Sequence, residues 1–89
     1  MSSELTLYEI YDANINGSNV KAIYLGEIAR FKSDQKVIAF RDEKGKIRCH
    51  RLRAYFCNNG KLEVKVSLTR KISNLEENFL NKLLTEKGA

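Results

Sequence analysis

The chain has 89 residues, of which 43% are hydrophobic and 30% charged, a composition that excludes a disordered chain and a length that suffices for one hydrophobic core. No apolar run approaches the ~18 residues of a membrane-spanning helix, and the N-terminus lacks the features of a signal peptide. We therefore expect a single cytoplasmic domain over residues 1–89, with no membrane partner.

The first two predicted strands are joined by a tight turn. Residues 5–12 are rich in strand-forming side chains and carry no helix start signal, so we predict a first strand there. Asn16 and Gly17 follow and can supply the positive φ angles of a hairpin turn. A second strand is predicted over residues 20–31. Gly26 lies near its middle, where we expect a bulge that lets the sheet curl.

Residues 36–41 and 46–57 are the third and fourth predicted strands, although a helix over residues 50–57 is a competing interpretation. Along the fourth strand the apolar positions change from odd to even numbers. A β-bulge at His50-Arg51 would explain this change of phase, because a bulge inserts one extra residue into a strand. We expect the apolar side chains after it to point inward, namely Leu52, Ala54 and Phe56.

The loop between these two strands decides which of their side chains are buried. Residues 42–45 (Asp-Glu-Lys-Gly) suit a type I turn. A four-residue loop pairs Phe40 with Ile47 and gathers apolar side chains on one face, whereas a three-residue loop pairs Phe40 with Arg48 and mixes the two faces. Because a buried face specifies register, we predict the four-residue loop.

A fifth strand and a helix complete the predicted elements. Residues 61–69 follow a turn signal at residues 58–60 and have the most regular alternation in the chain. Four apolar side chains of this strand are predicted to point inward: Leu62, Val64, Val66 and Leu68. Ser73 and Glu76 have the spacing of a capping box, in which each side chain bonds a free amide, so we predict a helix over residues 74–87.

The predicted helix is amphipathic. Its apolar side chains recur at helical spacing and form one stripe: Leu75, Phe79, Leu80, Leu83 and Leu84. Such a stripe either covers an open side of the sheet, which we favour, or forms a homodimer seam through Leu75, Phe79 and Leu83. The fold class is thus mainly β (β-rich α+β): about five antiparallel strands in a bent sheet or small SH3-like or OB-like barrel, then one C-terminal amphipathic helix. No motif ties the chain to a particular family.

Positive charge is concentrated in the middle third of the chain. Residues 30–53 hold nine Lys or Arg against three acidic residues, a net charge of +6, whereas the whole chain carries +5. Such a concentration of charge indicates a binding site for a polyanion or an acidic partner. The alternative is that these residues form a well-solvated pair of strands without a binding role. Arginine can bind phosphate through two nitrogens, and a base can stack on tyrosine. We predict nucleic-acid-binding residues on one outer sheet face and its loop: Arg41, Lys44, Lys46, Arg48, His50, Arg51, Arg53 and Tyr55.

The sequence offers little equipment for catalysis. It has one histidine and none of the glycine-rich phosphate-binding or nucleophile motifs, so we expect no enzymatic activity and no cofactor. Cys49 and Cys57 lack metal-ligand spacing, and their separation by eight residues on one strand argues against a disulfide. We expect reduced thiols and no metal site.

Two functions fit this pattern. The first is a small non-catalytic module that binds DNA or RNA mainly through phosphates, with some base stacking. The alternative is a protein-interaction module, for example a small regulator or inhibitor, that docks its basic face on an acidic surface of a larger protein. His50 is either a nucleic-acid contact or a polar side chain at the bulge, and repulsion by the neighbouring arginines is expected to lower its pKa.

Overall fold

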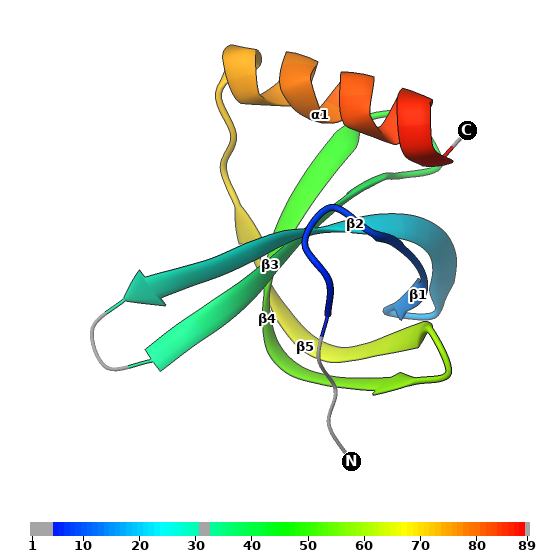
Figure 1. The fold of residues 1–89 in the computed structure, drawn as a ribbon, viewed down its shortest axis with the longest axis vertical. Coiled ribbons are helices and arrows are strands. Elements are labelled where there is room, and N and C mark those ends of the chain that lie inside the picture. Colours follow the sequence, from blue (N-terminus) through cyan, green and yellow to red (C-terminus); the bar gives the residue numbers. More distant parts are fainter. Residues whose placement is uncertain (1–4, 31–32, 89) are drawn as a thin grey trace.

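The chain folds into a closed barrel of five strands, across which one C-terminal helix lies (Figure 1). The computed structural model describes residues 5–30 and 33–88. The elements have the following bounds: β1, Ile10–Ile15; β2, Ser18–Arg30; β3, Ser33–Arg41; β4, Ile47–Asn58; β5, Lys61–Arg70; and α1, Asn74–Gly88. This architecture confirms the predicted small SH3-like or OB-like barrel followed by a helix.

The barrel closes through a parallel contact between its first and last strands. Consecutive strands are antiparallel, so β1 and β5 of the meander run in the same direction. Their pairing extends from Asp12 opposite Lys61 to Ile15 opposite Val64. Closure thus pairs the two sheet edges that an open meander would expose.

The first strand lies later in the chain than predicted, over Ile10–Ile15 and not residues 5–12. Asn16 and Gly17 form a two-residue turn with φ angles of 53° and 87°, and the strands pair immediately on either side of it. The turn therefore confirms the predicted hairpin and fixes where β1 ends. The residues before β1 form a turn that is hydrogen-bonded to β2.

Gly26 forms the predicted bulge in β2. The pairing of β2 with β3 shifts between Tyr24 and Gly26, and Gly26 has a φ angle of 100°, which side chains rarely tolerate. Beyond the bulge the β2–β3 hairpin continues as a two-stranded arm that leaves the barrel (Figure 1). Accordingly, β3 begins at Ser33, earlier than the predicted residue 36, and the predicted end of the second strand at residue 31 lies outside the described residues.

The hydrophobic core has two parts, which lie on opposite faces of β3. The barrel interior buries Ala13, Ile15, Ala22, Tyr24, Ile38, Phe40, Leu52, Leu62 and Val64. Between the outer sheet face and α1 lie Ile23, Val37, Ala39, Ile47, Cys49, Leu80 and Leu84. Because neighbouring side chains of a strand point to opposite faces, β3 is buried on both sides.

The β3–β4 hairpin has a three-residue loop, so the predicted four-residue loop is wrong. Phe40 pairs with Arg48. The Gly45 amide, at a φ angle of 80°, donates to Asp42 O (2.9 Å) and closes the type I turn expected over residues 42–45. The prediction assumed that only one face is buried. Since α1 covers the other face, this register still buries Phe40 in the barrel and Ile47 beneath the helix.

The predicted bulge at His50-Arg51 is also wrong, because pairing on both sides of β4 runs unshifted across these residues. The register shifts instead lie between Leu52 and Tyr55. Four apolar side chains predicted to point inward are therefore exposed: Ala54, Phe56, Val66 and Leu68. Ile47 and Cys49 face α1, whereas Leu52 faces the barrel interior. The apolar positions of β4 therefore change from odd to even numbers without a bulge.

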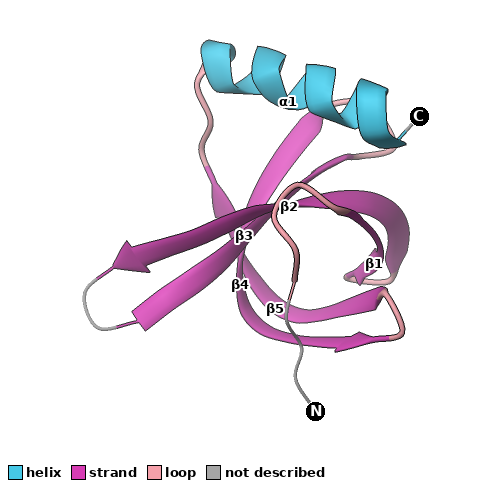
Figure 2. Cartoon of the chain, in the orientation of Figure 1, coloured by secondary structure: helices cyan, strands magenta, loops and turns pink. Residues whose placement is uncertain are grey.

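α1 covers the outer face of the sheet, as favoured from the sequence (Figure 2). The Ser73 hydroxyl accepts from the Glu76 amide (3.2 Å), but the Glu76 carboxylate pairs with Arg70 (2.8 Å), so only half of the predicted capping box forms. Leu80 and Leu84 are buried. Three stripe residues are less covered: Leu83 is half-buried, Phe79 is 50% exposed and Leu75 is 83% exposed.

Replacing Gly26 by alanine tests the bulge. We expect Gly26→Ala to lower the free energy of unfolding by about 1–3 kcal/mol, because the new Cβ would be held at a φ angle of 100°. Urea unfolding followed by far-UV circular dichroism measures the change. Ser18→Ala, at an exposed strand position, is the control and should change stability by less than about 0.5 kcal/mol. Wild-type stability of Gly26→Ala would contradict the bulge.

Candidate nucleic-acid interface

The fold divides the predicted basic face between the two sides of β4. Arg48 and His50 point to the barrel side, where they line an open hollow. Arg51 points to the opposite side, in line with the residues beneath α1. Arg53 is exposed at the register shift, and Tyr55 packs against the barrel core. These side chains therefore do not form the single outer face predicted from the sequence.

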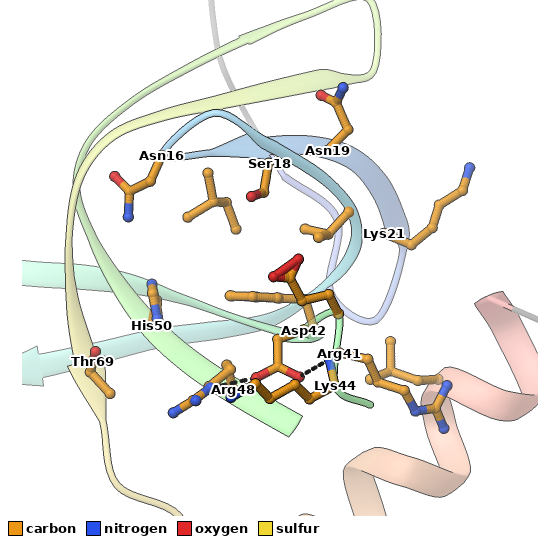
Figure 3. A pocket seen from close by; sticks show the side chains of 15 residues that line it. Asn16, Ser18, Asn19, Lys21, Arg41, Asp42, Lys44, Arg48, His50 and Thr69 are labelled. Atoms are coloured by element: carbon orange, nitrogen blue, oxygen red, sulfur yellow. Dashed lines mark hydrogen bonds and ion pairs between the residues drawn. The ribbon is translucent and has the colours of Figure 1, made fainter. Parts of the chain in front are cut away.

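The hollow has a volume of about 950 Å³ and lies between the β1–β2 turn, the β3–β4 loop and β4 (Figure 3). Four of the eight predicted binding residues line it: Arg41, Lys44, Arg48 and His50. Polar side chains from β5, β2 and the turn before β2 complete the wall: Asn16, Ser18, Asn19, Lys21 and Thr69. We call these nine residues the basic hollow. Lys46 is exposed in the adjoining loop but does not line it.

Arg41 joins the hollow to α1. Its Nη2 donates to Asn81 Oδ1 and Asn81 O (3.2 Å each) and to Thr85 Oγ1 (2.9 Å). Its guanidinium is therefore held against the helix. The main role of Arg41 is therefore to stabilise the wall of the hollow, and contact with a ligand is secondary.

Asp42 fixes the shape of the loop beside the hollow. Its Oδ1 accepts from the amides of Lys44 and Lys46 (2.9 Å each), and its Oδ2 accepts from Arg48 Nε (3.0 Å). These hydrogen bonds, that of the Lys46 amide foremost, lower the pKa of Asp42. The loop thus presents Lys44 at the rim, and the terminal nitrogens of Arg48 have no partner among the described residues.

His50 lies among partly buried groups in the hollow. Its Nδ1 is 2.9 Å from Ser67 Oγ, and its ring meets that of Phe40 edge-on with 5.1 Å between the centroids. Burial, and after it the charge of Arg48, lower the pKa of His50. The sequence had suggested charge repulsion alone. The imidazole is therefore neutral at neutral pH and can hydrogen-bond a ligand without adding charge.

The basic hollow is suited to a polyanion with hydrogen-bonding groups. Four cationic side chains line it against two acidic ones, Asp42 and Glu43, and Asp42 is already hydrogen-bonded. The asparagines and hydroxyls opposite can donate to and accept from base edges. These asparagines and hydroxyls, and Lys21, were not predicted to be binding residues, because they lie far from the charged segment in the chain. The pairing of β2 with β3 and of β4 with β5 brings them into the same wall, since Ala22 pairs with Phe40 and Thr69 with His50.

Comparisons of the chain with protein-family models, with curated proteins and with solved structures found no match in any of the three. No helix in the described part of the chain is long and apolar enough to cross a membrane. Residues 5–30 and 33–88 contain no group of three or more His, Cys, Asp or Glu side chains placed to hold a metal ion. Cys49 and Cys57 are free thiols, as predicted.

Removing the Arg41 side chain is expected to loosen α1. Arg41→Ala deletes the hydrogen bonds to Asn81 and Thr85, and we expect a loss of about 2 kcal/mol in the free energy of unfolding. Urea unfolding monitored by circular dichroism measures it. Lys44→Ala, which removes the same charge from an exposed side chain, should stay within about 0.5 kcal/mol of the wild type. Equal stability of both variants would contradict a stabilising role for the hydrogen bonds between Arg41 and α1.

The pKa of His50 predicts a pH dependence of stability. Because this pKa is lower in the folded state than the ordinary value of 6.5, the unfolded chain binds the proton first as pH falls. The free energy of unfolding should therefore decrease between about pH 7 and pH 5. His50→Gln should flatten that part of the profile, while the loss from Asp42 near pH 3 to 4 remains. An unchanged slope in His50→Gln would contradict the burial of the imidazole.

Proposed function

We propose that the protein is a non-catalytic nucleic-acid-binding module and that the basic hollow is its binding site. One observation carries the proposal. Cationic side chains from β3, the β3–β4 loop and β4, together with Lys21 from β2, line the same open hollow of about 950 Å³ as uncharged hydrogen-bonding side chains. A segment of phosphate backbone with its attached bases requires that combination.

Binding through this site is mainly electrostatic. Lys44 and Arg48 are the foremost phosphate ligands, because the Lys44 side chain is exposed and Arg48 has its terminal nitrogens available. Arg41 supports the wall through its bonds to α1. His50 in its neutral form and the asparagines of the β1–β2 turn supply hydrogen bonds to bases. Tyr55 packs against the barrel core, so base stacking on it has no part in this proposal.

Steep salt dependence is the first consequence. With about three phosphates contacted, affinity should fall roughly fortyfold between about 50 and 200 mM salt, because each contact releases a counterion. Fluorescence anisotropy with a labelled single strand and a labelled duplex measures the fall and shows which form is preferred. Absence of binding to both at low salt would overturn the proposal.

A matched pair of double variants locates the site. Lys44→Ala/Arg48→Ala removes two charges from the hollow and should weaken binding by about tenfold or more at low salt and reduce the salt slope by about two. Arg53→Ala/Lys65→Ala removes the same charge from exposed side chains outside the hollow and should leave affinity within about twofold. Equal losses in both variants would show that net charge, and not the hollow, governs binding.

A further inference from the structure

The outer face of the sheet is only partly covered by α1. The helix packs over the beginning of β4 and the neighbouring part of β3, whereas the β4–β5 hairpin extends away from it (Figure 2). On that uncovered part, apolar side chains are exposed: Phe56 at 55%, Val66 at 51% and Leu68 at 39%, with Ala54 beside them. We call these four residues, together with Arg51 and Arg53, the uncovered strip.

The strip is continuous across the two strands. Ala54 pairs with Val66, and Arg51 pairs with Leu68. Paired residues of neighbouring strands place their side chains on the same face, about 4.5–5.5 Å apart. The register shifts between residues 52 and 55 turn these side chains outward, since without them the alternation of Leu62 and Val64 would carry Val66 inward. The exposed apolar surface is thus a fixed feature of the pairing.

Arginine side chains accompany this apolar surface. Arg51 is half-buried, and its Nε is a buried donor that has no hydrogen-bond partner among the described residues. Because this atom is enclosed by the protein, the carboxylate of a partner would reach the terminal nitrogens of Arg51 and not Nε. Arg53 is exposed and also has no ion-pair partner among the described residues. The strip therefore offers positive charge together with aliphatic surface.

We propose that the uncovered strip docks a segment of a partner protein that presents apolar side chains together with at least one carboxylate. The apolar residues would pack on Phe56, Val66 and Leu68, and the carboxylate would accept from Arg51. Such pairing of desolvated apolar contacts with an arginine is typical of the energetically dominant part of protein interfaces. The proposal is independent of the basic hollow, which lies on the barrel side of β4.

Two other occupants fit the strip less well. A nucleic acid gains from stacking on rings, yet the strip has one ring, Phe56, and otherwise aliphatic side chains. A second copy of the chain would bring together two strips that each carry Arg51 and Arg53, and the like charges disfavour that contact. The arginines are complementary to a partner that carries negative charge.

The test uses a display library of random peptides selected on the intact protein, with Phe56→Ser/Val66→Ser as the counter-selection target. Enriched peptides are expected to combine apolar residues with Asp or Glu. For the best peptide, measured by fluorescence anisotropy, Phe56→Ser/Val66→Ser and Arg51→Gln should each weaken binding about tenfold or more. Leu75→Ser/Phe79→Ser, which changes the exposed apolar residues of α1 in the same way, should have an effect below about twofold.

Amide chemical-shift mapping of the wild-type protein with that peptide requires no variant and should locate the shifts on β4 and β5 at the strip. Lys44→Ala/Arg48→Ala should bind the peptide normally, so failure of the hollow and failure of the strip are distinguishable. The proposal would be overturned if no peptide that combines apolar and acidic residues were enriched, or if the chemical shifts lay outside the strip. Binding of oligonucleotides or anionic vesicles through Phe56 and Val66 would also overturn it. So would a dimer, seen in sedimentation, that Phe56→Ser/Val66→Ser dissociates.

Discussion

The packing of α1 on the outer face of the sheet is the constraint on which the rest of the structure depends. Leu80 and Leu84 are almost fully buried against Ile47 and Cys49, and burial of each such leucine contributes about 1.5–3 kcal/mol. With this layer present, both faces of β3 and the outer face of the start of β4 can be apolar, because each is covered. The hairpin can then adopt the register that its three-residue loop imposes, with Phe40 opposite Arg48.

That register decides where the positive charge lies. Arg48 and His50 point to the barrel side, opposite the β1–β2 turn, while Arg51 stays on the outer side. The cationic side chains also have different roles, because Arg41 is bonded to the helix and Arg48 to Asp42, whereas the Lys44 ammonium has no partner among the described residues. The concentration of charge in the middle of the chain therefore becomes two separate surfaces, a polar hollow and an arginine-bearing apolar strip.

Local chemistry explains which features the sequence could predict. The Asn16-Gly17 turn, the Gly26 bulge and the helix after Ser73 each depend on residues within a few positions, and all three are found. The face that each side chain occupies depends on what covers it, and nothing within residues 46–57 indicates that α1 covers part of this strand. For that reason the predicted bulge at residues 50–51 was wrong. The contribution of Lys21 and Thr69 to the hollow was missed because it depends on the register of β2 with β3 and of β4 with β5, which the charged segment itself does not indicate.

The measurement that addresses the proposed binding site most directly is an amide chemical-shift titration of the protein with a short single-stranded oligonucleotide at low salt. If the basic hollow is the interface, the shifts will cluster in the β1–β2 turn, the β3–β4 loop and the start of β4, around Lys44, Arg48 and His50. Shifts centred on Arg53 and Phe56, or no shifts at a saturating oligonucleotide concentration, would contradict a nucleic-acid site in the hollow.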